Sequence, residues 1–156
     1  MCEQNRTPGY VHLKRMLAYP EQQNLQDLKA KFANEQGSKA TTYKEMNSSL
    51  NVHQVYRTST YIEERKRIIF TKFRTSSHSL KVETGRWSRM PREQRLCECG
   101  GGVQDEKHVV FDCVKTEEVR IKFGVNSQVY CNVGEMMDNH ECVELVNFID
   151  ECMKCF

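Results

Sequence analysis

Hydrophobic residues are concentrated in the second part of the chain, where their spacing is helical. Residues 53–156 hold 26 of the 34 Leu, Ile, Val and Phe residues, and residues 1–52 hold the other eight. A segment with so few apolar side chains cannot bury a core of its own. We therefore expect a mainly α-helical fold, with a small helical domain at 53–156 and a weakly helical or flexible region at 1–52.

The stretch 61–73 has the pattern of an amphipathic helix. Its apolar side chains fall on one side of a helical wheel, at Tyr61, Ile62, Ile68, Ile69 and Phe73. The next stretch, 75–95, is polar and contains the only tryptophan. We expect it to be an extended loop with little core of its own.

A second helix is predicted from Asp105 to Phe123. Asp105 is a suitable N-cap, and Gly124 is typical of the residue that follows a helix. Apolar positions on the side of this helix that should face the core are Val109, Val110, Cys113 and Val114.

The last helix is predicted from about Gly134 to Cys155. Its apolar stripe repeats at helical spacing and consists of Cys142, Val146, Ile149 and Met153, with Leu145 and Cys152 beside it. The acidic residues lie mainly on the other side. Packing against the rest of the domain is the expected role of this helix.

Composition limits the size of the core and the class of protein. Hydrophobic residues make up 38% of the 156 residues and the mean hydropathy is −0.69, so only a small core is expected. No run of 18 apolar residues and no apolar leader segment are present, so we expect an intracellular protein of the nucleus or cytoplasm that does not span a membrane. The eight cysteines are then better interpreted as thiols or metal ligands than as a disulfide framework.

The net charge of +2 conceals a strongly segmented chain. Residues 57–96 carry eleven Lys and Arg against four Asp and Glu, whereas residues 133–156 carry one against six. The basic segment could contact nucleic-acid phosphates, or it could pair with the acidic C-terminal segment of the same chain. The candidate phosphate contacts are Lys72, Arg74, Lys81, Arg86, Arg89, Arg92 and Arg95. Trp87 could stack on a base, or it could cover the cysteine cluster or the helix at 61–73.

Cysteine and histidine residues cluster around a run of three glycines. The potential ligands are Cys97, Cys99, His108 and Cys113. Three thiolates and one imidazole form a Cys3His set, which is typical of a structural zinc site. Glycines 100–102 would let backbone N–H groups turn toward thiolate sulfur.

The spacing of the last two ligands is unusual for a zinc site. Positions five apart on an ideal helix point about 140° away from each other, so His108 and Cys113 could share an ion only if the helix is distorted. The alternative is that Cys113 is a core thiol while Cys97, Cys99 and His108 lie on the surface.

A second possible ligand set is less convincing. It consists of His140, Cys142, Cys152 and Cys155. Cys142 and Cys152 lie on the apolar stripe of the last helix, where buried thiols behave as small hydrophobic residues. Packing is therefore the favoured interpretation, although Cys152 and Cys155 could also form a redox pair.

The middle of the chain, about residues 56–123, resembles a known family. The resemblance is carried by Phe73-Arg74, His78, Leu80, Glu83, Gly85-Arg86-Trp87, Pro91-Arg92, Arg95, Cys97, Cys99, Asp105-Glu106, His108 and Cys113. Their order is similar to the C-terminal zinc-knuckle region of reverse transcriptases from non-LTR, LINE-type retrotransposons of animals. The resemblance implies a zinc-stabilised module that helps the element's protein to hold RNA or target DNA, with Cys97, Cys99, His108 and Cys113 as ligands.

Catalytic motifs are missing from the sequence. A reverse transcriptase needs paired aspartates that hold two metal ions, and the chain has no Asp-Asp pair. It also has no phosphate-binding Gly-Lys-Ser/Thr loop and no His-Glu-x-x-His motif. We therefore expect a non-catalytic, nucleic-acid-binding remnant of such an element, with no small-molecule substrate. The alternative is a helical protein-interaction or structural module with no nucleic-acid role.

Overall fold

The structure, a computed structural model, divides the chain into two units at residues 1–40 and 41–156. It describes residues 26–27, 29–31, 34, 43–47, 51–58 and 61–156. The described residues of the first unit are helical and exposed. Most of the predicted N-terminal region, 1–52, lies outside the described residues. Its described part at 43–47 is included in the second unit, where Met46 is buried.

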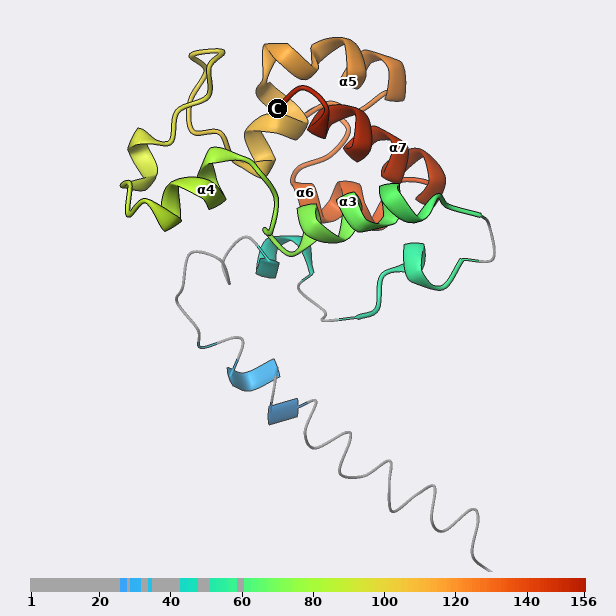
Figure 1. Cartoon of the computed structure of the whole chain (residues 1–156). Helices are drawn as coiled ribbons and strands as arrows, with labels where there is room; N and C mark the ends of the chain where they lie inside the picture. The colour runs from blue at the N-terminus through green and yellow to red at the C-terminus, as the bar shows by residue number, and fades with distance from the viewer. Residues whose placement is uncertain (1–25, 28, 32–33, 35–42, 48–50, 59–60) are drawn as a thin grey trace, which may run out of the picture. The chain divides into compact units, whose positions relative to one another are not determined.

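The second unit is mainly helical, as predicted. Its α-helices are α3 (Glu64–Arg74), α4 (Lys81–Trp87), α5 (Glu117–Phe123), α6 (Val133–Asn139) and α7 (Cys142–Met153) (Figure 1). A π-helix at His108–Asp112 and 3-10 turns at Gln54–Tyr56, Arg92–Gln94 and Val114–Thr116 complete it. Among the described residues, the one β-pairing is an antiparallel bridge between Leu96 and Val103. None of the described helices is both long and apolar enough to cross a membrane.

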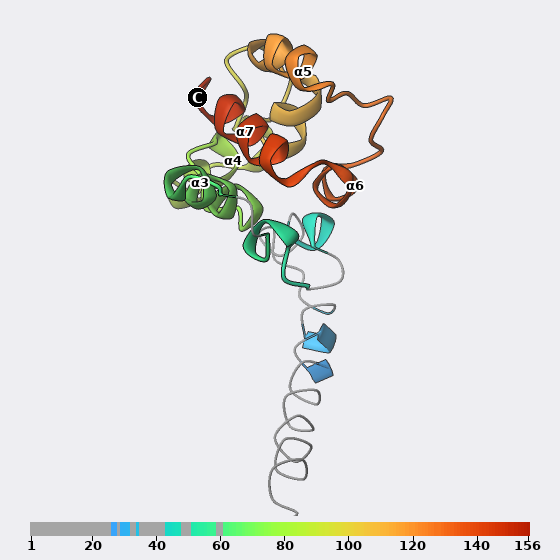
Figure 2. The ribbon, with the colours of Figure 1, turned by 90° about the vertical axis from the view of Figure 1, so that its right-hand side faces the viewer.

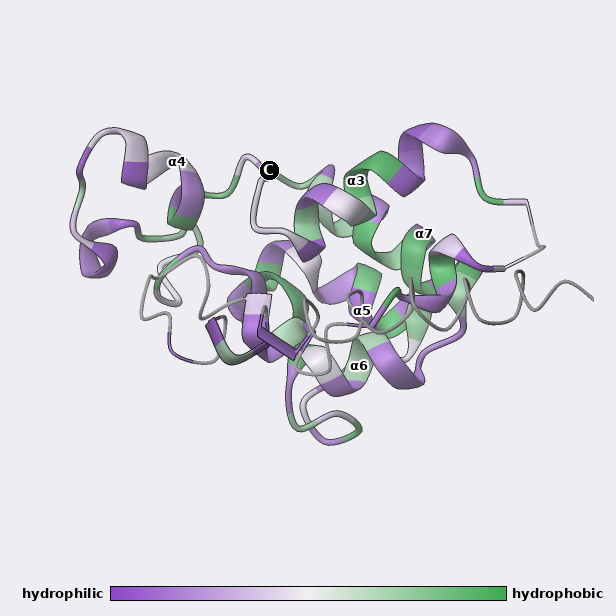
Figure 3. Cartoon of the chain, turned by 90° about the horizontal axis from the view of Figure 1, so that it is seen from below, coloured by the Kyte–Doolittle hydropathy of each residue, from purple (hydrophilic) through white to green (hydrophobic). Residues whose placement is uncertain are grey.

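The core lies where α3 and α7 run side by side (Figure 2). Phe70 and Phe73 of α3 are fully buried, as are Phe148 and Ile149 of α7. Figure 3 shows that the apolar segments of these two helices are brought together, whereas the region around α4 is mainly hydrophilic. Phe123 adds an edge-to-face contact with Phe148, with ring centroids 5.8 Å apart, and so attaches α5 to α7.

The first predicted helix forms, and its predicted apolar side is confirmed in part, since Phe73 and Ile62 are buried and Ile69 packs against the core. Phe70 is fully buried, while Ile68 is 45% exposed and Tyr61 lies before the helix and is 84% exposed. Residues two apart differ by about 200° on a helix, so Phe70 and Ile68 cannot both face the core. Burial of Phe70 together with Phe73 therefore fixes the rotation of α3.

The prediction of an extended loop at 75–95 is wrong, because this stretch contains α4. Leu80 and Val82 are buried against the core. The periodicity is too weak to reveal a helix because only seven residues form it, and most of them are polar. Contacts with residues distant in sequence hold α4 in place, as described below.

The helices predicted at 105–123 and 134–155 are each interrupted in the structure. Cys113 has an extended backbone that separates the π-helix from α5, and Val114 is 64% exposed, although it was expected on the apolar stripe. A second break at His140 separates α6 from α7, where the Glu141 side chain accepts hydrogen bonds from the N–H groups of Val143 and Glu144. These caps satisfy helix-end donors that a continuous helix would not expose.

Other predictions for this region are confirmed. Asp105 caps the π-helix by accepting a 2.9 Å hydrogen bond from the His108 N–H. Gly124 ends α5 in the left-handed conformation, with φ of 66°. The predicted stripe of α7 is mostly in the core, since Leu145, Val146, Ile149 and Cys152 are buried and Cys142 and Met153 are partly buried.

Candidate metal centre

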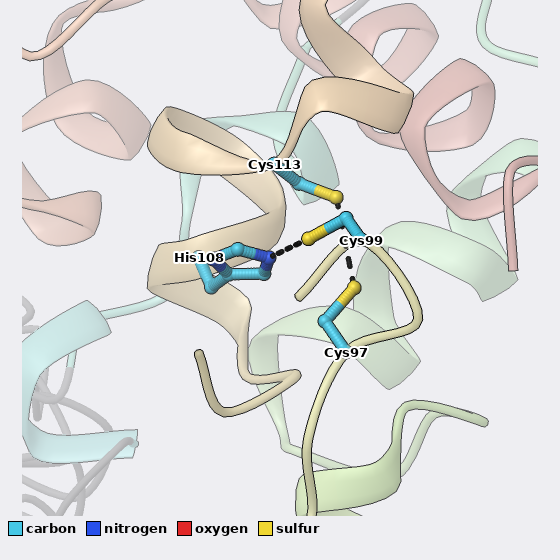
Figure 4. Close-up of side chains that lie close together, drawn as sticks. All are labelled: Cys97, Cys99, His108 and Cys113. Atoms are coloured by element: carbon cyan, nitrogen blue, oxygen red, sulfur yellow. Dashed lines mark hydrogen bonds between the residues drawn. The ribbon is translucent and has the colours of Figure 1, made fainter. Parts of the chain in front are cut away.

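The four predicted ligands converge from a hairpin and a π-helix. Cys97 and Cys99 lie on the hairpin, and His108 and Cys113 lie at the start and just beyond the end of the π-helix (Figure 4). Their ligand atoms all lie within 4.8 Å of one another. The sequence therefore predicted the correct set of neighbours, and the alternative of scattered surface residues is wrong.

Backbone hydrogen bonds and glycines shape the hairpin. The Cys97 N–H donates to the Gly102 carbonyl at 2.8 Å, and the Gly100 N–H donates to the Cys97 carbonyl at 3.0 Å. Gly100 and Gly102 have φ of 77° and 134°, which residues with a β-carbon rarely adopt. At Gly101, a β-carbon would lie 3.0 Å from Cε1 of His108. The turn therefore needs glycine for its backbone conformation and for its approach to the ligand.

The π-helix explains how ligands five residues apart can meet. The Cys113 N–H donates to the His108 carbonyl at 2.8 Å, which is the i to i+5 bond of a π-turn. This wider turn places Cys113 next to His108, whereas an ideal α-helix would separate the two by about 140°. The helix distortion that the spacing required is thus present.

The distance between two of the sulfur atoms suits tetrahedral coordination, and all four ligand atoms are close together. The Sγ atoms of Cys97 and Cys113 are 3.7 Å apart, and Cys99 Sγ lies 3.1 Å from His108 Nε2. Bonds of ~2.3 Å at tetrahedral angles put two sulfur atoms about 3.8 Å apart. Cys97, His108 and Cys113 are buried, and none of the described cysteines is in a disulfide. The four side chains are close enough to hold one metal ion.

The two closest thiols have opposite pKa shifts. Burial raises the pKa of Cys97, but hydrogen bonds from Cys99 and Gln104 outweigh this and lower it to about 6. Burial, together with the neighbouring thiols, raises the pKa of Cys113 to about 12. A bound divalent cation would hold all three ligand thiols as thiolates, since a coordinating thiol is deprotonated.

Gln104 links the cluster to α4 and was not identified from the sequence. Its Nε2 lies 3.8 Å from Cys97 Sγ, and its Oε1 accepts a 2.9 Å hydrogen bond from the Lys81 N–H. Its backbone carbonyl accepts from Val82, and its N–H donates to Arg95. A single glutamine between a valine and an aspartate carries no sequence signal for this role.

Two of the predicted phosphate contacts, Arg95 and Arg74, are buried and donate hydrogen bonds to backbone carbonyls. Arg95 donates to the Met90 carbonyl from Nε at 2.9 Å and to the Val82 carbonyl from Nη1 at 2.7 Å. Its side chain packs over Gly85, where a β-carbon would lie 2.8 Å from the arginine Cδ. Arg74 is buried and donates to the Asn51 carbonyl at 3.3 Å. Both guanidinium groups stabilise the fold.

The other predicted contacts lie on or near the surface. Arg86 pairs with Glu83 at 2.8 Å, and Arg92 pairs with Asp105 at 2.6 Å. The remaining cations, Lys72, Lys81 and Arg89, have no side-chain hydrogen bond or ion pair with a described residue.

Trp87 lies at the end of α4 and is 81% exposed. It therefore covers neither the cysteine cluster nor α3, which excludes the packing role considered for it. The exposed tryptophan and the unpaired cations Lys81 and Arg89 all belong to α4 or the turn after it.

Direct compensation between the basic and acidic segments is limited. Among the described residues, one ion pair joins 57–96 to 133–156, between Arg65 Nη2 and Asp150 Oδ2 at 3.1 Å. Lys66 also donates to the Asn147 side chain at 2.7 Å. Most of the positive charge of the basic segment is not paired with the acidic helix.

The second possible ligand set is not assembled. His140 contacts the Tyr130 hydroxyl through Nδ1 at 2.9 Å, and Cys152 is fully buried in the core, which raises its thiol pKa. The cluster around His108 is the one group of three or more potential ligands in the described part of the chain. Packing therefore accounts for Cys142 and Cys152.

Comparisons with known proteins identify no relative of this chain. No protein-family model matches the chain, and neither a curated protein nor a solved structure matches it significantly. The resemblance to retrotransposon reverse transcriptases rests on the residues quoted above, and the function has to be argued from the geometry.

Proposed function

We propose that this chain is a non-catalytic module in which a structural zinc ion orders a surface that binds nucleic-acid strands. The observation that carries the proposal is an exposed tryptophan at the end of a short helix, α4, whose first turn is hydrogen-bonded to Gln104 beside the metal cluster. Trp87 provides an aromatic face, and Lys81 and Arg89 provide positive charge.

Zinc is the metal that suits the donor set. Three thiolates and one imidazole in tetrahedral reach are typical of Cys3His zinc sites. Four protein ligands leave no coordination position for water or substrate, so the ion has a structural role. The absence of paired aspartates in the sequence agrees with a module that catalyses no nucleotide transfer.

The metal would act on the binding surface through Gln104. This residue contacts a ligand thiol with its side chain and holds the first turn of α4 through Lys81 and Val82. Arg95 then closes the following turn onto α4. Ordering of the hairpin therefore fixes the backbone that presents Trp87.

The surface would recognise the shared features of nucleic acids. Base stacking on an aromatic side chain contributes roughly 1–3 kcal/mol and tolerates any base. Lysine and arginine contacts with phosphates carry no sequence information. Binding of single-stranded RNA or DNA with little sequence preference is the expected activity, in agreement with what the family resemblance implies.

The metal is tested by native mass spectrometry of the purified chain and a Cys97→Ser variant. One zinc ion per chain, lost in the variant, is the expected result. Well-folded protein without zinc would remove the structural basis of the proposal.

Binding is tested through the fluorescence of Trp87, the only tryptophan in the chain. Single strands should quench it, with an affinity that falls with salt by a slope of about −0.7 per neutralised phosphate. Arg89→Gln should make the slope shallower by about 0.7. Tyr61→Ala, which removes an aromatic residue exposed to a similar degree, serves as the control in anisotropy measurements against Trp87→Ala. Absence of binding, or equal losses in both aromatic variants, would favour a protein-interaction module instead.

A further inference from the structure

A pocket with both charged and apolar lining residues lies between α3 and the C-terminal end of α7, and none of the metal ligands lines it. Its volume is about 360 Å³. Residues of α3, of the turn after it and of the end of α7 line the pocket: Arg65, Ile69, Lys72, Ser77, His78, Ser79, Asp150, Met153 and Lys154. None of these is a predicted metal ligand, and Lys72 is the one that the sequence predicted as a phosphate contact.

The pocket combines three cations with one carboxylate. Asp150 is 1% exposed, and its Oδ2 binds Lys154 Nζ at 2.7 Å and Arg65 Nη2 at 3.1 Å. Burial alone would raise the pKa of Asp150, but the two cations bring it below its usual range. The carboxylate thus holds two cations at the pocket while each retains further N–H donors. Lys72 has no ion pair among the described residues and adds a third positive charge.

The turn that forms one side of the pocket is fixed by buried hydrogen bonds. Glu106 Oε1 accepts from Ser76 Oγ at 2.6 Å and lies 2.8 Å from His78 Nε2. The Leu80 N–H donates to His78 Nδ1 at 3.3 Å, which leaves the proton on Nε2 for the bond to Glu106. Because all three side chains are buried, Ser77 and Ser79 are presented from a rigid backbone.

Other lining atoms suit a sugar or base next to an anion. Ile69 and Met153 add apolar surface to the pocket. The second oxygen of Asp150, Oδ1, is buried and has no hydrogen-bond partner among the described residues. A hydroxyl donor on a ligand could satisfy this oxygen, since buried acceptors without partners are unfavourable.

We propose that this pocket binds a phosphate monoester, supplied by the terminal phosphate of a nucleic-acid strand or by a free nucleotide. A monoester carries a charge of about −1.5 to −2 and three strong acceptor oxygens, which match three cations better than the single charge of a backbone diester. The inference rests on the proposed function for its preferred source, the end of a strand. It extends that function from contacts along a strand to recognition of its end.

The experiment compares two single strands of identical sequence, labelled at the 3′ end, that carry a 5′-phosphate or a 5′-hydroxyl. Anisotropy with the full, zinc-loaded chain should give an affinity about fivefold or more higher for the phosphorylated strand. Lys72→Gln should abolish this preference. Lys72 is exposed without a partner, so the substitution leaves the fold intact. Lys122→Gln removes the same charge from α5, outside the pocket, and should retain the preference.

Titrations with adenosine monophosphate and inorganic phosphate, followed by NMR, separate the two sources. If neither strand binds but adenosine monophosphate shifts the residues of the pocket in a Lys72-dependent way, the pocket serves a free nucleotide and the proposed function fails. If both strands bind equally and neither small phosphate perturbs the pocket, the phosphate site is overturned while the proposed function stands.

Discussion

The α3–α7 pair and the hairpin at residues 96–104, here called the knuckle, are ordered by different forces. Between the helices, Phe70, Phe73 and Phe148 are fully buried, so apolar packing fixes their positions. The apolar residues at the base of the knuckle are not buried in the same way, since Leu96 is 52% exposed and Val103 is half-buried. Its order depends on backbone hydrogen bonds, glycine conformations and four converging ligands.

The chain therefore orders its apolar core and its candidate metal centre by separate means. The helix pair needs no ion to exclude water from its aromatic side chains. The knuckle encloses thiols that are costly to bury as charged groups, and a cation makes that arrangement favourable. We therefore expect the two regions to respond differently to substitution and to metal removal.

The largest effect is expected in the helix pair, from Phe148→Ala. Truncating this fully buried ring should lower the free energy of unfolding by about 3–5 kcal/mol, because it removes apolar burial and leaves a cavity. Urea unfolding followed by circular dichroism measures the loss. Ile121→Ala, at a position that is 75% exposed, is the control and should change stability by less than about 0.5 kcal/mol. If saturating zinc restores the stability of Phe148→Ala, the two regions are not separate.

A smaller and more local effect is expected from metal removal. Taking free zinc from a hundredfold excess over its dissociation constant to zero should reduce the free energy of unfolding by about 2.7 kcal/mol. Amide exchange should accelerate in the knuckle and the π-helix while α3 and α7 retain protection. Cys97→Ser should reproduce this pattern in the presence of zinc, and Cys131→Ser, at an exposed thiol, should not. Collapse of both regions on chelation would contradict the comparison.

The two regions also differ in how well the sequence predicts them. The helical class, the stripe on α7 and the end of α5 at Gly124 follow from local periodicity and cap chemistry. The rotation of α3 does not, because only the packed core shows that Phe70 rather than Ile68 lies inside. The predictions of continuous helices across Cys113 and His140 are wrong, because a π-turn ends the first helix at Cys113 and Glu141 caps a new helix after His140.

The ligand set was predictable from residue type and from its grouping around three glycines, although the π-turn that brings His108 and Cys113 together was not. The roles of the residues around the ligand set were harder to predict from the sequence. Arg95 is the residue type expected of a phosphate contact. Its side chain instead packs over Gly85, and its guanidinium group donates hydrogen bonds to backbone carbonyls. Gln104 has no sequence signal at all. Charge can be counted along a sequence, but whether a guanidinium faces solvent or the backbone is decided by the fold.

The smallest expected effect compares two glycines with positive φ, one inside the knuckle and one outside it. Gly100 in the knuckle has φ of 77° and Gly124 at the end of α5 has φ of 66°. A β-carbon would meet no atom within 4 Å at either site. Alanine therefore introduces only the cost of a left-handed conformation, about 1–2 kcal/mol.

If the knuckle is ordered only when its ion is bound, Gly100→Ala should lower zinc affinity about tenfold. The reason is that the free-energy cost of the left-handed alanine arises only when the metal brings the ligands together. Gly124→Ala should lower the free energy of unfolding by about the same 1–2 kcal/mol and leave zinc affinity unchanged. A competition titration with a colorimetric chelator and a urea titration, each on both variants, measure the two quantities. Equal changes in zinc affinity would mean that α5 and the knuckle form one cooperative unit. Equal losses of stability in zinc-free protein would mean that the knuckle is ordered before the ion binds.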